Sequence, residues 1–388
     1  MTNSAGKPEF RSYIETLRHH AAARPNQTAY VFLENGEIES GRLTYGELDI
    51  RARSIAARLQ AGADPGDRVL LLYPPGLEFI CAFLGCLYAG MIAVPAYPPR
   101  QNRSAARLQG IVSDCSPVLA LTTASTRDGF ERRTAGVRGL ENLQWFATDD
   151  GEEPHAGAWT ETPAGWDTLA FLQYTSGSTG TPRGVMVSHG SLLHNSEMIR
   201  TSFRHDGSTI FATWLPLFHD MGLIGNTLHP LHLGICSVLM EPAAFIQKPI
   251  RWLQAVTKYR ATTTGGPNSA YDLCVRKVTE EQKADLDLSC LRIAYNGSEP
   301  VRVETLDRFA AAFAGCGLRP EALYPCYGLA EATLLVTGSS VDELPVTGEF
   351  DRRLVSSGQP SIGCKVFVVD PERCIPLEDG GTGEIWVA

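Results

Sequence analysis

The chain has 388 residues, of which 44% are hydrophobic and 20% are charged. This composition is that of a soluble globular protein, and the length suffices for two or three lobes or one large mixed domain. The formal net charge of -9, without a long run of Lys or Arg, argues against nucleic acid as a partner. The ten cysteines form no CxxC pair and no zinc-like spacing, so we expect buried, reduced thiols in a cytoplasmic protein.

Helices and strands alternate over the first 165 residues, which is typical of an α/β fold with mostly parallel sheets. Thr44 has Glu47 three residues on, and this capping pair predicts a helix through Gln60. The other elements that we expect here are helices at Ser12–Arg24 and Phe79–Ala89, and strands at Thr28–Leu33, Arg68–Leu72, Met91–Val94, Val118–Thr122 and Gln144–Ala147.

One stretch is nearly long enough to cross a membrane, because Phe79 to Tyr97 contains no charged residue. It contains Gly85, Gly90 and Pro95 and changes character midway. We therefore expect a buried helix joined by glycine to a buried strand, and no membrane span. The N-terminus also lacks the basic and then apolar pattern of a secretory signal.

A second set of alternating elements follows the polar, Gly- and Pro-rich segment Asp149–Pro163, and runs to about Val336. Beyond it the pattern changes to short strands, such as Lys365–Val369 and Glu384–Val387. We expect subdomains at 1–165, 166–338 and 339–388, the last one β-rich. The strands predicted for the second subdomain are Thr168–Gln173, Thr209–Ala212, Ile235–Leu239, Leu291–Tyr295 and Leu323–Pro325, and its helices are Gly190–Phe203, Pro249–Tyr259, Ser269–Val278 and Val303–Ala314.

The segment YTSGSTGTPRGV, from Tyr174 to Val185, is expected to join a strand to the helix after His189. Its glycines allow tight turns and close approach to a ligand, and its hydroxyls and backbone N–H groups can surround phosphate oxygens. Arg183 adds a planar cation. Pro182 stands where a Walker A loop has its second glycine, and a plain linker would not normally carry this ending between two elements. The phosphate ligands that we expect are Thr175, Ser176, Gly177, Ser178, Thr179 and Gly180.

Three further motifs follow in the chain. WLPLFHDMGLIG, from Trp214 to Gly225, places a His-Asp pair among apolar residues, which suits a carboxylate-binding pocket with an apolar extension. From the residues alone, His219 is equally well explained as a core histidine with Asp220 as its partner. NGSEP, Asn296 to Pro300, is by itself only a turn, and YGLAEAT, Tyr327 to Thr333, follows another predicted strand.

In this order the motifs resemble those of the acyl-adenylate-forming superfamily, which includes acyl-CoA synthetases, peptide-synthetase adenylation domains and luciferases. The family usually has Lys at the position of Arg183, and the arginine keeps the charge. The resemblance implies the large N-terminal domain of the adenylate-forming fold, two α/β subdomains and the start of a small β-barrel-like one. GEIWV, Gly383 to Val387, resembles the strand before the family's ribose-binding aspartate. We therefore expect the domain with the catalytic lysine to lie beyond Ala388, and this chain alone to adenylate poorly.

The resemblance also implies site roles, with ATP and Mg²⁺ as cofactors. His219 and Arg183 are then catalytic, and Glu331 and Thr175 hold the metal. The implied acyl pocket consists of Phe218, Met221 and Gly222, and the implied adenine site of Asn296, Gly297, Ser298, Glu299, Tyr327 and Gly328.

Within the superfamily, AVPAYPP (Ala93–Pro99), GGPNSAYDLCVRKV (Gly265–Val278) and Ala330 resemble fatty acyl-AMP ligases. Such enzymes activate a fatty acid to acyl-AMP and pass the acyl group to an acyl-carrier protein in lipid or polyketide biosynthesis. The branch usually carries an insertion after YGLAEAT, where this chain has only Ser339 to Arg353. An acyl-CoA ligase therefore stays an alternative, and so does a non-catalytic nucleotide-binding, carrier-docking module. We expect a monomer.

Overall fold

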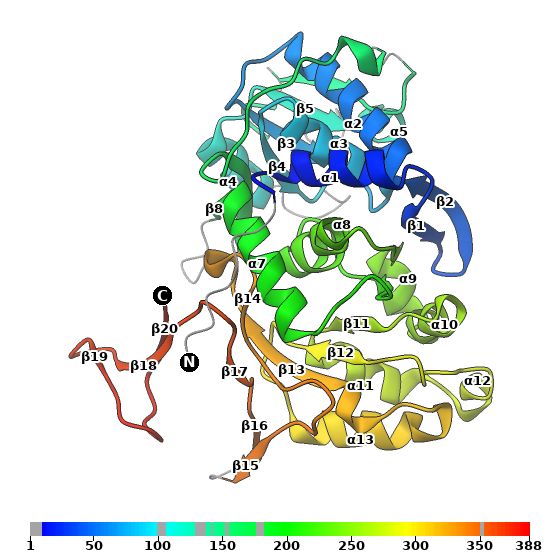
Figure 1. The fold of residues 1–388 in the computed structure, drawn as a ribbon, viewed down its shortest axis with the longest axis vertical. Coiled ribbons are helices and arrows are strands. Elements are labelled where there is room, and N and C mark those ends of the chain that lie inside the picture. The colour runs from blue at the N-terminus through cyan, green and yellow to red at the C-terminus, as the bar shows by residue number, and fades with distance from the viewer. Residues whose placement is uncertain are drawn as a thin grey trace.

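The computed structural model describes residues 10–98, 106–128, 137–140, 143–151, 155–175, 182–349 and 353–388. Two large sheets organise these residues (Figure 1). The six-stranded sheet has the order β6-β5-β3-β4-β7-β8, and the nine-stranded sheet has the order β17-β14-β13-β12-β11-β9-β10-β1-β2. Within the described residues, no helix is long and apolar enough to span a membrane.

The six-stranded sheet is parallel from β6 to β7, and only β8 runs antiparallel. Side chains of β3 alternate between two apolar clusters, since Val69 and Leu71 pack in one and Leu70 and Leu72 in the other. Both faces of the sheet are therefore covered. Its strands are β3 (Arg68–Leu72), β4 (Ile92–Ala96), β5 (Leu119–Thr122), β6 (Gln144–Ala147), β7 (Leu169–Thr175) and β8 (Arg183–Ser188).

One face of this sheet carries α2 (Tyr45–Gln60) and α3 (Leu77–Tyr88), and the other carries α4 (Ala106–Cys115). The Thr44–Glu47 capping box opens α2 as predicted. Helices α2 and α3 pack closely, because a Cβ at Gly85 would lie 2.5 Å from Ile55 Cγ2. The short helices nearby are α5 (Ala124–Arg127) and η1 (Ala156–Ala158).

The nine-stranded sheet is parallel from β1 to β13, with antiparallel strands at its ends. Helices α7 and α8 lie between the two sheets, and α11 and α13 cover the far face (Figure 1). The strands are β1 (Thr28–Glu34), β2 (Ile38–Thr44), β9 (Phe211–Thr213), β10 (Ser237–Met240), β11 (Thr263–Gly266), β12 (Ile293–Asn296), β13 (Leu323–Gly328), β14 (Leu335–Gly338) and β17 (Gln359–Pro360).

The helices around this sheet are α1 (Tyr13–Ala23), α7 (His189–Ser202), the π-helix η2 (Met221–Leu228), α8 (His229–Leu233), α9 (Pro242–Gln247), α10 (Ile250–Tyr259), α11 (Asn268–Lys277), α12 (Glu280–Lys283), α13 (Val303–Phe313), and the single turns η3 (Ala314–Cys316), η4 (Pro320–Ala322) and η5 (Ala330–Ala332). After β14 come the hairpin β15 (Thr347–Glu349) and β16 (Arg353–Val355), and a three-stranded sheet of β18 (Val366–Asp370), β19 (Ile375–Pro376) and β20 (Glu384–Val387).

The α/β fold with mostly parallel sheets is confirmed, but β11 was not among the predicted strands. Strand β8 was not predicted: the segment after β7 returns as an antiparallel strand before α7 begins at His189, because Arg183–Ser188 pairs with Leu169–Thr175. Each sheet also takes strands from both sides of residue 165. Strands β1 and β2 join the nine-stranded sheet, whereas β7 and β8 join the six-stranded one.

Candidate active site

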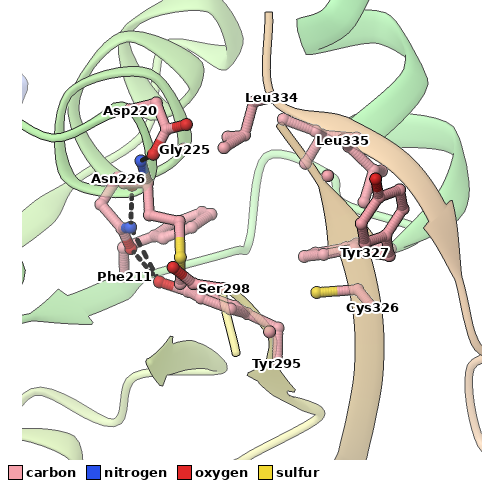
Figure 2. A pocket seen from close by; sticks show the side chains of 15 residues that line it. Phe211, Asp220, Gly225, Asn226, Tyr295, Ser298, Cys326, Tyr327, Leu334 and Leu335 are labelled. Carbon is pink, nitrogen blue, oxygen red and sulfur yellow. Dashed lines mark hydrogen bonds between the residues drawn. The ribbon is translucent and has the colours of Figure 1, made fainter. Parts of the chain in front are cut away.

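A pocket with an empty volume of about 600 Å³ lies against the face of the nine-stranded sheet that α7 and η2 cover. Figure 2 shows side chains from distant parts of the chain on opposite sides of this pocket. Its wall is mostly apolar, and three of the motifs supply residues to it. The apolar wall contains Ile199, Phe203, Phe211, Met221, Leu334 and Leu335, and the motif residues are Asp220, Met221, Gly297, Ser298, Tyr327 and Gly328.

The His-Asp pair stands at the start of η2. His219 Nδ1 lies 2.6 Å from Asp220 Oδ1, and the Met221 N–H donates to the same oxygen at 2.7 Å. The hydrogen bond to Asp220 raises the pKa of His219 above its ordinary value. The His219 side chain is 49% exposed, so it is not a core histidine. Asp220 lines the pocket and fixes the ring of its neighbour, while His219 itself lies beside the lining.

The two ends of this motif are held by neighbouring elements. The Phe218 ring meets Tyr97 edge-on at 5.0 Å, and Gln173 of β7 donates to the Phe218 carbonyl at 3.0 Å. A Cβ at Gly222 would lie 2.1 Å from the Pro216 carbonyl oxygen, so only glycine fits there. Neither Phe218 nor Gly222 is in the pocket wall. They attach the pocket to the strand that leads to the predicted phosphate loop.

The π-helix η2 forms one wall, and such helices often occur at functional sites. Asn226 is buried there. Its Nδ2 donates to the Met221 carbonyl at 2.6 Å and lies 2.7 Å from the Tyr295 hydroxyl, which donates to Asn226 Oδ1 at 2.9 Å (Figure 2). This network fastens η2 to β12 across the pocket wall.

The turn after β12 and the last residues of β13 meet at the other side of the pocket. A Cβ at Gly297 would lie 2.8 Å from the Cys326 carbonyl oxygen, and one at Gly328 would lie 1.8 Å from the Leu334 carbonyl oxygen. These glycines let the backbones approach and leave Ser298 and the Tyr327 ring at the pocket. Burial raises the pKa of the Cys326 thiol to about 12, so this thiol is a protonated part of the wall.

The structure does not bring two of the predicted adenine ligands to this pocket. Asn296 is fully buried, and among the described residues both polar atoms of its side chain lack a hydrogen-bond partner. Side chains alternate along a strand, and the preceding Tyr295 faces the pocket. Glu299 turns to α11, where its carboxylate accepts a hydrogen bond from the Ser269 N–H.

Of the predicted phosphate ligands, Ser176, Gly177, Ser178, Thr179 and Gly180 lie outside the described residues. Thr175 ends β7 and is paired with Arg183 at the start of β8. The Arg183 side chain is exposed, and the described part of the chain holds no carboxylate paired with it. The cation therefore stands available for an anionic ligand beside Thr175.

Glu331 lies on the turn η5 and is exposed. Its carboxylate makes no hydrogen bond or ion pair within the part of the chain that the structure describes. The described residues contain no group of three or more His, Cys, Asp or Glu side chains that could enclose a metal. Magnesium bound through phosphates needs only one or two carboxylates, so a single free carboxylate fits this mode of binding.

The sequence motifs did not point to Ile199, Phe203, Asn226, Tyr295 or Leu335. Ile199 and Phe203 are four residues apart on one face of α7, and this spacing was a signal for a shared surface. Which surface that face would meet depended on the packing of α7 against the sheet, and no local pattern contains that information.

The described residues thus combine mostly parallel sheets, an arginine (Arg183) with no carboxylate partner among them, and an apolar pocket with a polar rim. The family model for AMP-binding enzymes matches residues 17–388, and the chain belongs to this family.

Relatives in this family show the same likeness over almost the whole chain. The medium-chain-fatty-acid–[acyl-carrier-protein] ligase JamA of Moorena producens is 42% identical, over 98% of this chain and 69% of the relative. The long-chain-fatty-acid–AMP ligase FadD28 of Mycobacterium tuberculosis is 34% identical, over 97% and 69%. The crystal structure of a fatty acid AMP ligase from Legionella pneumophila superposes with a TM-score of 0.92 at 46% identity, over 98% of this chain and 68% of that one.

Proposed function

We propose that this chain activates a fatty acid with ATP, forming acyl-AMP and pyrophosphate, and that the acyl group then passes to an acyl-carrier protein. The observation that carries the proposal is the pocket, whose apolar wall ends at Asp220, Ser298 and Tyr327. Burial of an alkyl chain against such a wall stabilises the complex, while the polar rim suits a nucleotide. The names of the relatives, fatty-acid ligases for AMP and for acyl-carrier protein, support the same substrate class.

In the proposed reaction a carboxylate oxygen attacks the α-phosphorus of ATP, and the bond to pyrophosphate breaks. The protein has little covalent chemistry to perform, so its residues act by position and charge. Arg183 and Thr175, side by side on β7 and β8, bind phosphate oxygens. Tyr327 and the Gly297–Ser298 turn hold the adenine, with Gly328 allowing the close turn.

His219 faces the substrate carboxylate in this proposal. Asp220 holds the imidazole by its Nδ1 and raises its pKa, which leaves Nε2 available and favours a positive charge. Met221 begins the acyl wall. Glu331, with Thr175, would hold Mg²⁺, which when bound neutralises charge on the phosphates. Asn296 and Glu299 are proposed to support the adenine turn from behind, because neither reaches the pocket wall.

The acceptor is tested by product mass. Incubation of the enzyme with fatty acids of graded length, ATP and Mg²⁺ is expected to give acyl-AMP, and added acyl-carrier protein is expected to become acylated. Formation of acyl-CoA in preference to acylated carrier protein would overturn the proposal that a carrier protein is the acceptor. The alignment with JamA spans 406 positions, more than this chain has residues, so the relative carries segments without a counterpart here.

The fatty-acid panel also tests the reaction itself. Acid-dependent exchange of labelled pyrophosphate into ATP is expected, and binding of ATP without such exchange would indicate a non-catalytic module. The subdomain boundaries at residues 165 and 338, a monomeric state and a cytoplasmic location stay predictions.

A further inference from the structure

Helix α4 contacts both ends of the segment that joins β7 to β8, although no motif pointed to it. The contacts come from Arg107, Gly110 and Asp114, which are three and four residues apart and therefore share one face of the helix. A neighbouring side of α4 is buried in the core of the six-stranded sheet through Leu108, Val112 and Cys115. The helix is thus fixed to the sheet and presents its other face to the phosphate end of the site.

At the first end of the segment, two side chains of α4 form hydrogen bonds with Tyr174. Arg107 donates from Nη2 to the Tyr174 carbonyl at 3.3 Å, and the Tyr174 hydroxyl donates to Asp114 at 2.5 Å. At the second end, the ring of Pro182 lies against the helix. A Cβ placed on Gly110 would be 3.0 Å from Pro182 Cδ, which shows how close the two backbones come.

No carboxylate of the described residues neutralises the charge of Arg107. Most described arginines have a carboxylate partner, but in the described ranges none pairs with Arg107, whose side chain is exposed. Its one hydrogen-bond partner there is a backbone carbonyl, so several of its five N–H donors remain free. Arg107 also acts electrostatically on His219, since its positive charge opposes the rise in the pKa of that histidine. Its contact with the Tyr174 carbonyl places the guanidinium beside the end of β7 where Thr175 and Arg183 pair.

We propose that Arg107 is a phosphate-binding residue of this enzyme, which binds the polyphosphate of ATP and of released pyrophosphate together with Arg183. The reasoning rests on the proposed function, because it assumes that ATP binds beside Thr175 and Arg183. A chain with a net charge of -9 attracts a polyanion only where local cations oppose that charge. Arg107 and Arg183, which have no carboxylate partner among the described residues, supply them, and their planar donors match phosphate oxygens.

The test is calorimetric titration of ATP, pyrophosphate and AMP into the wild-type enzyme and its variants. Arg107→Gln is expected to weaken the binding of ATP and of pyrophosphate roughly tenfold, and to leave the binding of AMP unchanged. A roughly tenfold loss corresponds to the lower range for a charged hydrogen bond at an exposed position. Arg107→Lys keeps the charge and should retain part of the affinity. Arg138→Gln is the matched control, because Arg138 is also exposed, and it contacts Gln109 of α4 only through backbone atoms.

A second variant separates ligand binding from folding. Gly110→Ala raises helix propensity, so it should not destabilise α4, but its methyl group would press on Pro182. We expect weaker ATP binding with an unchanged melting temperature. Wild-type affinity for ATP in both Arg107→Gln and Gly110→Ala, or an equal loss of AMP and ATP affinity in Arg107→Gln, would overturn the proposal. Failure of the wild-type protein to bind ATP at all would instead overturn the proposed function.

Discussion

The hydrogen-bond network between Asn226 and Tyr295 leads to a prediction about both stability and acid binding. Asn226 is buried, contacts the Met221 carbonyl and the Tyr295 hydroxyl, and holds the π-helix against β12. In Asn226→Ala both of these groups lose a partner at a buried position. Each such loss costs about 1–3 kcal/mol, so we expect the free energy of unfolding to fall by about 2–4 kcal/mol.

Tyr295→Phe removes only the hydroxyl and leaves Asn226 Oδ1 without its donor. We expect it to cost about 1–2 kcal/mol, because one polar atom is left unpaired instead of two. The two changes break the same contact, so the double variant should be more stable than the sum of the singles predicts, by about 1 kcal/mol. Urea unfolding of the wild type, both single variants and the double variant measures this coupling.

The same variants should raise the KM for the fatty acid and leave the KM for ATP unchanged, since both residues line the apolar part of the pocket. Asn268→Ala is the matched control. Asn268 is also buried, and its side chain bonds Thr305 and the Arg302 N–H outside the pocket. It should lose similar stability with no change in the KM for the acid. Additive unfolding energies, or an equal effect on the acid KM from Asn268→Ala, would refute the reasoning.

Three further predictions concern charged groups. Glu331→Gln should reduce Mg²⁺-dependent turnover at least tenfold without changing the melting temperature, because its carboxylate has no partner in the described structure; an unchanged Mg²⁺ titration would remove Glu331 from the metal site. Asp220 raises the pKa of His219, so this pair stabilises the fold below the ordinary His pKa of about 6.5, and the contribution is lost as the pH rises through the raised value. Asp220→Asn should lower the His219 pKa in an NMR titration, and an unmoved midpoint would contradict the assignment. Glu299→Gln should cost about 1 kcal/mol of stability through α11 and leave the KM for ATP unchanged, whereas a higher KM for ATP would return Glu299 to the adenine site.

Much of the fold followed from local patterns. Thr44 with Glu47, the uncharged stretch that begins at Phe79 and the short apolar strands each contain their own signal, and the structure has an element at each of these places. Strand β8 had no such signal. RGVMVS alternates only weakly, and the residues before it were interpreted as a phosphate loop that leads to the helix after His189.

The candidate site was predictable where backbone geometry restricts the residue type. Gly297 and Gly328 stand where a Cβ would collide with a carbonyl oxygen, and the motifs point to them directly. The apolar wall was not predictable in the same way, because Phe203, Phe211 and Leu335 are ordinary core residues in their own elements. They line a pocket only because the packing of η2 leaves a space beside β12 and β13. That space depends on how the layers pack together.

Strand β8 has β7 as its single neighbour in the described sheet, and it carries Arg183 at one end. Every second amide of such an outer strand faces away from the ladder, and Met186 is 74% exposed on it. Local opening there breaks few contacts, so hydrogen exchange should be faster in β8 than in β3 or β4. Nucleotide held at Arg183 would slow that exchange. Deuterium uptake by Gly184–Ser188 would therefore report occupancy of the phosphate site in the unlabelled protein, before any chemistry takes place.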